Sequence, residues 1–314
     1  MKALCKLALA VFAAFSATVA WAKEPPKVVV TIAPVHSLIA AVMQGVGEPK
    51  LLVTGASSLH AYALKPSDAK ALKDADAVFW VGEGMETFMV KVLKSLPKKT
   101  RMVELAVAPG VQLLAPREGG VWEEDAHGHG HKHEKHEDHG EHEMHIWLDP
   151  ANGEAIVRAV AGVLAEIDPE RAAVYRANEE KTLAGLKALD AEIKVELQAV
   201  GKTPFIVFHD AYQYFENRYG LSAAGSITVS PDRKPSAKRL SQIRAKIRDV
   251  KAACVFAEPQ FDSALVGVVA EGTGAKTGAL DPEGATLPPG PELYPALLKN
   301  IAVSLKACLG SPTG

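Results

Sequence analysis

Residues 27–82 alternate short apolar runs with longer amphipathic ones: KVVVTI (27–32), HSLIAAVMQG (36–45), PKLLV (49–53), PSDAKALKDA (66–75) and AVFWVG (77–82). Runs rich in valine, isoleucine and leucine are typical of strands buried on both faces of a parallel sheet. Segments with one apolar stripe are typical of the helices that cover such a sheet. This stretch therefore predicts an α/β lobe, in which ligands normally bind at the loops after the carboxyl ends of the strands.

The same alternation returns in the second half of the chain. Its strand-like runs are PFIVFHD (204–210), LSAAGSIT (221–228), AACVFAE (252–258) and KTGALD (276–281), and a helical stretch at 291–309 closes the chain. We therefore expect an N-terminal α/β lobe over 23–168 and a C-terminal one over 201–314. One large sheet is the competing architecture.

A long helical stretch between the two halves argues against a single sheet. Between Pro169 and Val200, apolar residues fall at steps of three and four, and Gly201 ends the pattern. The stripe consists of Leu186, Leu189, Ile193, Leu197 and Val200. Thirty-two residues span about 48 Å at 1.5 Å per residue. We predict a rigid backbone helix over 169–200 that joins two α/β lobes with mainly parallel sheets.

The N-terminus has the features of a secretory signal peptide. Lys2 and Lys6 flank the start of an apolar stretch, 7–19, that is short for a bilayer span, and Ala20-Trp21-Ala22 provides a small-x-small cleavage site. We expect residues 1–22 to be removed, which leaves an exported chain of about 292 residues. An uncleaved anchor helix is the alternative, and the charged residues and prolines that follow at once argue against it.

The charge of the chain is nearly balanced. Loss of the two leader lysines moves the formal charge from −2 to −4, with acidic and basic residues mixed along the sequence. This balance argues against nucleic acid as a partner.

Cys254 and Cys308 are the two cysteines of the mature sequence. In an oxidising compartment two cysteines are more often bonded than free, and this bridge would stabilise the fold by roughly 4 kcal/mol through loop entropy. The alternative, a pair of metal-binding thiolates, lacks a second cysteine or histidine near either residue.

Eight of the eleven histidines lie between His127 and His145, in HGHGHKHEKHEDHGEHEMH. Imidazole is the commonest protein ligand for zinc, copper, nickel and iron, so the run indicates transition-metal chemistry. It lacks an apolar period, and we expect a mobile surface loop over 117–143 instead of a fixed coordination cage. Its auxiliary, low-affinity ligands would be His127, His129, His131, His133, His136, His139 and His142.

A fixed site needs three or four nitrogen, oxygen or sulfur ligands, which can come from far apart in sequence. His60, His145 and His209 each lie at or near a predicted strand-to-helix junction. An ordinary hydrogen-bonded loop histidine is the alternative for each. Asp281 ends the apolar run KTGAL before a turn, where an acid is also a common turn cap. His36 is expected to be a pocket-edge or capping histidine.

Several blocks of the sequence resemble the signature blocks of the metal-binding solute receptors of bacterial ABC transporters. They cover essentially the whole mature chain in the family's order: HAYALKPSDAKALKDADAVFWVGEGMETF (60–88), HIWLDP (145–150), FIVFHDAYQYF (205–215), FAEPQF (256–261) and LDPEG (280–284). The histidine-rich insertion ahead of HIWLDP is similar to that of the zinc-specific, ZnuA-type branch.

The resemblance implies two lobes joined by a rigid helix, with one metal in the cleft between them. It places the family's three zinc histidines on His60, His145 and His209, and the carboxylate of its LDP block on Asp281. Many zinc-type members from Gram-negative bacteria carry a glutamate directly before the first histidine, where this chain has Leu59. This departure leaves Asp281 or a water as the fourth ligand. Zinc-type members also link the late strand to the C-terminal helix by a disulfide, which agrees with the pairing expected above.

These features predict a high-affinity periplasmic receptor that binds Zn²⁺ and delivers it to an inner-membrane ABC permease with its ATPase. The histidine-rich loop would be an auxiliary zinc collector or sensor, or else a dispensable solvated insertion. We further expect a monomer, with a periplasmic zinc chaperone as another partner.

Two other functions compete with the zinc receptor. A manganese or iron receptor of the same family is one, although three imidazoles favour zinc over the harder manganese ion. A three-histidine zinc centre of a hydrolytic enzyme is the other. The chain has no His-Glu-x-x-His, Gly-x-Ser-x-Gly, phosphate-loop or dinucleotide motif, which argues against an enzyme.

Overall fold

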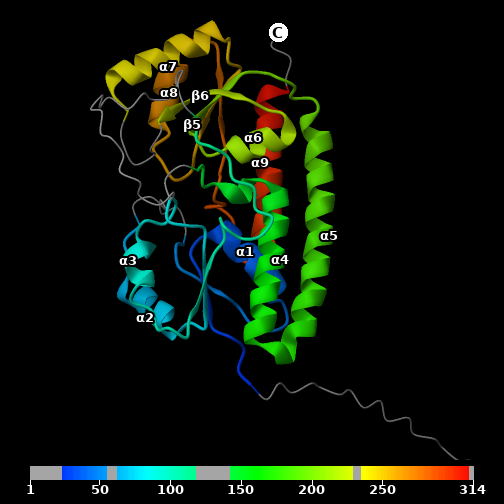
Figure 1. Ribbon diagram of the computed structural model, residues 1–314. Coiled ribbons are helices and arrows are strands. Elements are labelled where there is room, and N and C mark those ends of the chain that lie inside the picture. The colour runs from blue at the N-terminus through cyan, green and yellow to red at the C-terminus, as the bar shows by residue number, and fades with distance from the viewer. Residues whose placement is uncertain (1–22, 55–61, 118–141, 229–234, 311–314) are drawn as a thin grey trace, which may run out of the picture.

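The computed structural model describes residues 23–54, 62–117, 142–228 and 235–310 (Figure 1). The predicted signal peptide, His60 and its neighbour Leu59 lie outside the described residues. So do six histidines of the rich run, His127, His129, His131, His133, His136 and His139.

The N-terminal half forms a four-stranded parallel sheet in the order β2-β1-β3-β4. Its strands are β1 (Val28–Val30), β2 (Lys50–Leu51), β3 (Ala77–Trp80) and β4 (Arg101–Glu104). Every residue of the two central strands is buried, as expected for apolar runs covered on both faces. The more exposed strands, β2 and β4, lie at the edges.

The C-terminal half repeats this order, β6-β5-β7-β8, again with parallel pairing. Its strands are β5 (Phe205–His209), β6 (Ala223–Thr228), β7 (Cys254–Ala257) and β8 (Lys276–Ala279). The prediction of two α/β lobes with parallel sheets is confirmed, and the single large sheet is excluded for the described residues. The predicted lobe boundaries themselves stay predictions.

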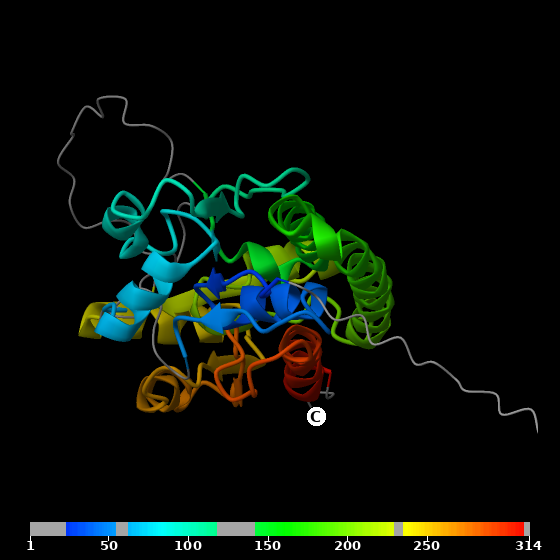
Figure 2. The same ribbon diagram turned by 90° about the horizontal axis from the view of Figure 1, so that it is seen from below.

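Most helices of the described residues lie on two opposite flanks of the molecule (Figure 1). The helices are α1 (Ala33–Val42), α2 (Pro66–Asp74), α3 (Met89–Leu93), α4 (Pro150–Ile167), α5 (Ala172–Leu197), α6 (Gln213–Tyr219), α7 (Ala237–Asp249), α8 (Ala264–Ala270) and α9 (Leu293–Leu309). Helices α2 and α3 of one lobe and α7 and α8 of the other lie on one flank, and α4, α5 and α9 lie on the opposite one (Figures 1 and 2). The long helices α4 and α5 run side by side as the backbone of the molecule.

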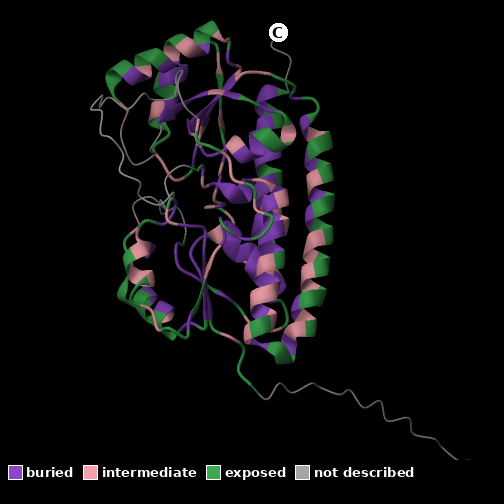
Figure 3. Ribbon diagram, in the orientation of Figure 1, coloured by how far each residue is buried: buried purple, intermediate pink, exposed green. Residues whose placement is uncertain are grey.

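Helix α5 is shorter than the sequence predicted. A 3₁₀ turn, Pro169–Arg171, precedes it, because Asp168 receives two hydrogen bonds from the buried Arg171 guanidinium, at 3.0 and 2.9 Å. The helix proper has 26 residues, or about 39 Å. All five residues of the predicted apolar stripe are buried. Their face packs on α4 and α9, and the opposite face of α5 is exposed (Figure 3).

One apolar core runs from β1 through α4 and α5 to α9, so the two lobes share packed side chains. Polar contacts add to it: the Ser37 hydroxyl of α1 donates to Pro291 O at 3.0 Å, and Ser37 Oγ accepts from Tyr294 N of α9 at 2.9 Å. The close approach of α4 to α9 requires glycine at position 153, since a Cβ there would lie 2.6 Å from the Tyr294 hydroxyl. This close packing joins the two lobes on the side of α4, α5 and α9.

Cys254 of β7 and Cys308 of α9 form a disulfide, as predicted. The bridge fastens the C-terminal helix to the second sheet. No helix within the described ranges has both the length and the apolar character needed to cross a bilayer.

Candidate metal centre

His145 and His209 meet between the lobes. His209 is the last residue of β5, at the carboxyl end of the second sheet, and His145 directly precedes the 3₁₀ turn Ile146–Leu148 that leads into α4. Their side chains are 8% and 4% exposed. The two Nε2 atoms lie 3.3 Å apart.

A buried carboxylate holds the far side of each imidazole. The Glu258 Oε2 atom lies 2.6 Å from His209 Nδ1. Glu143 pairs in the same way with His145 Nδ1, and its carboxylate also accepts from His145 N at 3.1 and 3.2 Å. In the tautomer in which each Nδ1–H donates to its carboxylate, the Nε2 lone pair of each ring is directed towards the other ring and is available to a metal ion.

The pKa values of the two histidines are shifted in opposite directions. Burial, together with the charge of His209, lowers the pKa of His145 well below its usual value. Burial alone would also lower the pKa of His209, but the charge and hydrogen bond of Glu258 outweigh it, and the pKa of His209 is raised. Burial raises the pKa of Glu143 to about 8. Two imidazoles backed by carboxylates suit a cation, which would take the place of a proton between them.

The separation of the Nε2 atoms matches a zinc site. Zinc binds imidazole nitrogens at about 2.0 to 2.1 Å in a tetrahedron, which places two such nitrogens about 3.3 Å apart. His145 and His209 already have this spacing. Trp147 and Phe261 pack against the two rings, with centroid separations of 5.3 and 6.2 Å, and restrict their rotation.

The remaining predicted ligands do not complete the group within the described residues. No set of three or more histidine, cysteine or acidic side chains there is placed to hold a metal ion. His60 lies outside those residues. Asp281 caps the turn after β8: its Oδ1 accepts from Glu283 N at 3.1 Å, Gly284 N at 2.9 Å and the Gln260 side chain at 3.0 Å. Its buried Oδ2 has no hydrogen-bond partner among the residues that the structure describes.

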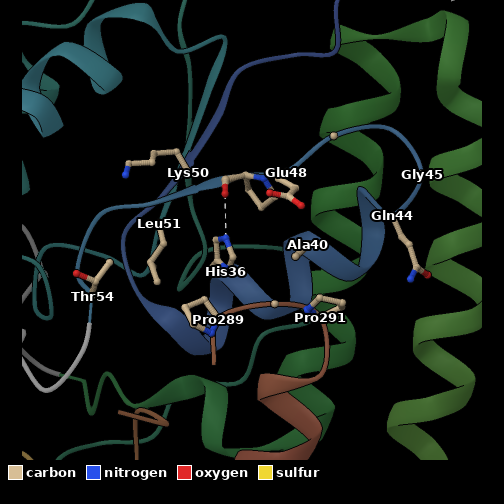
Figure 4. A pocket seen from close by; sticks show the side chains of 13 residues that line it. His36, Ala40, Gln44, Gly45, Glu48, Lys50, Leu51, Thr54, Pro289 and Pro291 are labelled. Atoms are coloured by element: carbon tan, nitrogen blue, oxygen red, sulfur yellow. Dashed lines mark hydrogen bonds between the residues drawn. The ribbon is translucent and has the colours of Figure 1, made fainter. Parts of the chain in front are cut away.

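His36 belongs to a different place in the molecule. Its Nε2 donates to Pro49 O at 2.9 Å, and burial lowers its pKa. It lines a pocket of about 530 Å³ between α1, the segment 44–54 and the segment 289–291 (Figure 4). His142, the last member of the auxiliary set, is exposed.

Sequence reasoning missed Glu143 and Glu258 as functional residues. Glu143 stands two positions before His145, close enough for its carboxylate to return to the ring. Glu258 follows β7, the parallel neighbour of β5, so the carboxyl ends of the two strands bring it beside His209. Both signals are visible only once the ligands and the strand order are known.

Comparison with known proteins gives one family. The family model described as zinc-uptake complex component A, periplasmic (ZnuA), matches residues 28–308. The high-affinity zinc uptake system protein ZnuA of Brucella abortus is 49% identical over 312 residues, covering 92% of this chain and 93% of that protein. The protein of the same description from Yersinia pestis is 37% identical over 289 residues, covering 90% and 91%.

The chain is also similar in structure to solved ZnuA proteins. A crystal structure of ZnuA superposes with a TM-score of 0.76 at 26% identity and covers 91% of this chain and 100% of that one. A structure of a ZnuA deletion mutant with zinc bound superposes with a TM-score of 0.74 at 25% identity, covering 92% and 99%.

Proposed function

This chain belongs to the ZnuA family of periplasmic zinc-uptake components, and from that membership we propose that it is a high-affinity zinc receptor that delivers Zn²⁺ to an ABC-type importer. One observation carries the proposal in this molecule: two buried Nε2 atoms 3.3 Å apart, each on a ring oriented by a carboxylate. This spacing is the edge of a zinc tetrahedron.

We propose that His60 supplies the third imidazole and that Asp281 or a water completes the tetrahedron. Zinc-uptake relatives support the assignment of the cargo, and nitrogen ligands disfavour manganese, which prefers oxygen. Zinc affinity then falls in acid, because protonated imidazoles cannot bind metal. Metal analysis of protein purified without a histidine tag separates zinc from the alternative manganese or iron cargo.

We also propose a cleaved leader, 1–22, a monomeric periplasmic protein, and a membrane permease with its ATPase as the receiving partner. A periplasmic zinc chaperone is a further proposed partner. The protein is proposed to have no catalytic role, since its sequence carries none of the catalytic motifs considered above and its relatives are described as zinc-uptake proteins. Tight zinc uptake without esterase or hydratase turnover is the expected result, and turnover that depends on His209 would contradict it.

Single replacement of the ligands tests the site. In titrations against a competing chelator, we expect His60→Ala, His145→Ala and His209→Ala each to lose the tight zinc equivalent. His142→Ala is the matched control, because this histidine is exposed and lies three residues from His145. Unchanged zinc affinity in all three ligand variants would refute the assignment.

The histidine-rich run is proposed to collect zinc with lower affinity. Deletion of 118–141, which removes His127 through His139, is expected to abolish weak zinc equivalents and to keep the tight one. If the tight equivalent disappears with the deletion, the proposed division between a fixed site and an auxiliary run is wrong.

A further inference from the structure

The two stems of the histidine-rich insertion meet before they reach the metal centre. Leu114, on the entering stem, and Glu143, on the leaving stem, form an antiparallel bridge in which Glu143 N donates to Leu114 O at 2.9 Å. We call this pair the neck of the insertion. His145 follows the neck by two residues, so the position of the leaving stem sets the position of a metal ligand.

Helix α6 of the second lobe holds the neck on both stems. The buried Tyr214 hydroxyl accepts from Leu114 N at 3.1 Å and donates to Glu143 O at 2.7 Å. Gln213, the preceding residue, donates to Ala115 O at 2.9 Å. The hydroxyl thus uses both its donor and an acceptor position to join the two stems to α6.

Arg117 fastens the entering stem to the same lobe. Its guanidinium lies 2.7 Å from Glu216 Oε2 and 3.2 Å from Asp210 Oδ1. The Arg117 side chain is only 19% exposed and that of Glu216 only 3%, so water screens the pair weakly. Asp210 directly follows His209, and the clamp therefore reaches the residue beside the second ligand.

We propose that Arg117 and Tyr214 are positioning residues for zinc: they clamp the neck to the second lobe and so hold His145 at ligand distance from His209. This inference rests on the proposed zinc site. Twenty-four residues separate Arg117 from His142, and a segment of that length does not by itself fix the distance between its ends. The clamp makes the geometry of the tight site independent of the insertion. Because the ligands are already in place, less free energy is spent on ordering them when zinc binds.

Two substitutions test the clamp in the full-length protein. Tyr214→Phe removes the hydroxyl and keeps the ring, and Arg117→Gln removes the charge. We expect each variant to lose zinc affinity about tenfold or more, the scale seen when groups that orient a ligand are removed. With Co²⁺ as a spectroscopic probe, we also expect weaker visible d–d absorption, because the absorption reports the tetrahedral ligand geometry and not folding. Tyr219→Phe is the matched control, since this hydroxyl of α6 binds Asp190 on α5 and not the neck.

Deletion of the insertion supplies the decisive second measurement. Removal of 118–141 leaves four residues between Leu114 and Glu143, a length common in hairpin loops, so the short connection itself keeps the neck closed. In the Tyr214→Phe background we therefore expect the deletion to restore both zinc affinity and the Co²⁺ spectrum. Wild-type affinity and spectrum in both single variants would overturn the proposal, and so would a loss that the deletion fails to restore. The proposed function would instead be refuted if His209→Ala, made in the otherwise unchanged protein, bound zinc as tightly as the parent does.

Discussion

At the residue scale, the centre consists of two imidazoles that the protein orients before any metal arrives. Glu258 holds His209 through Nδ1 and also lies 3.3 Å from His209 N and 3.4 Å from the Tyr212 hydroxyl. The carboxylate therefore fixes both the tautomer and the direction of the ring. Orientation by a hydrogen-bond acceptor and attraction by its charge are separable contributions, and a substitution can distinguish them.

We predict that Glu258→Leu weakens zinc binding about 10- to 100-fold, because His209 loses its acceptor. Glu258→Gln keeps a carbonyl oxygen for Nδ1–H and is expected to lose less affinity than the leucine variant. Competition with a chelator measures both, and the exposed Glu271→Leu serves as the control in the same lobe. Equal zinc affinity in the leucine variant and the parent would show that His209 needs no oriented partner.

At the element scale, the strands of the first lobe surround a carboxylate that has no contact with water. Glu86 is fully buried and accepts from the Thr31 hydroxyl at 2.5 Å, Val81 N at 3.0 Å and Gly82 N at 2.9 Å. These donors join the ends of β1 and β3. Burial outweighs them, however, and raises the pKa of Glu86 to about 7.

The raised pKa gives a prediction with a definite sign. An acid with a folded-state pKa above its unfolded value destabilises the fold as the pH rises from the unfolded towards the folded value. We expect the metal-free protein to lose on the order of 3 kcal/mol more unfolding free energy than Glu86→Gln between pH 4 and pH 8. Urea unfolding at several pH values measures the difference, and parallel pH profiles for the two proteins would contradict it.

The elements themselves could largely be predicted from sequence. The runs at 27–32, 77–82 and 252–258 contain β1, β3 and β7, because a strand buried on both faces needs a continuous apolar run. The ends of α5 could not be predicted from periodicity. The predicted helix begins at Pro169, but residues 169–171 form a 3₁₀ turn. That turn depends on the buried Arg171–Asp168 pair and on the packing around it.

The site was predictable in part for the same reason. His145 and His209 lie next to predicted strands and turns and belong to the sequence blocks that resemble the family. The structure brings the two residues together. Glu143, Glu258 and the neck contacts depend on which strands and stems become neighbours. Local sequence does not encode those neighbours. The positions of His60 and Asp281 in the metal centre stay predictions.

At the scale of the whole molecule, the two lobes are packed together through a shared apolar core. Helix α5 runs along both lobes, with α4 beside the first lobe and α9 beside the second (Figure 1), and the apolar core is continuous between the lobes. Trp147, beside the metal centre, donates to Pro282 O at 2.8 Å and accepts at its own carbonyl from Tyr294 at 2.7 Å. A large hinge rotation would have to break this packing.

We therefore predict little change in overall shape when zinc binds. The radius of gyration from small-angle X-ray scattering is expected to be the same for the zinc-free and zinc-bound protein within experimental error. Shared cores resist rigid-body rotation, and adjustment is left to loops and small tilts. A clear compaction on addition of zinc would show that the backbone helices bend.

The central claim is that one zinc ion binds between His145 and His209. Anomalous diffraction at the zinc absorption edge, on crystals grown with one equivalent of zinc, tests it most directly. We predict a single strong peak at about 2.0 to 2.1 Å from both Nε2 atoms, with His60 as a further ligand. A zinc peak that contacts neither imidazole, or zinc bound only within the histidine-rich run, would contradict the account.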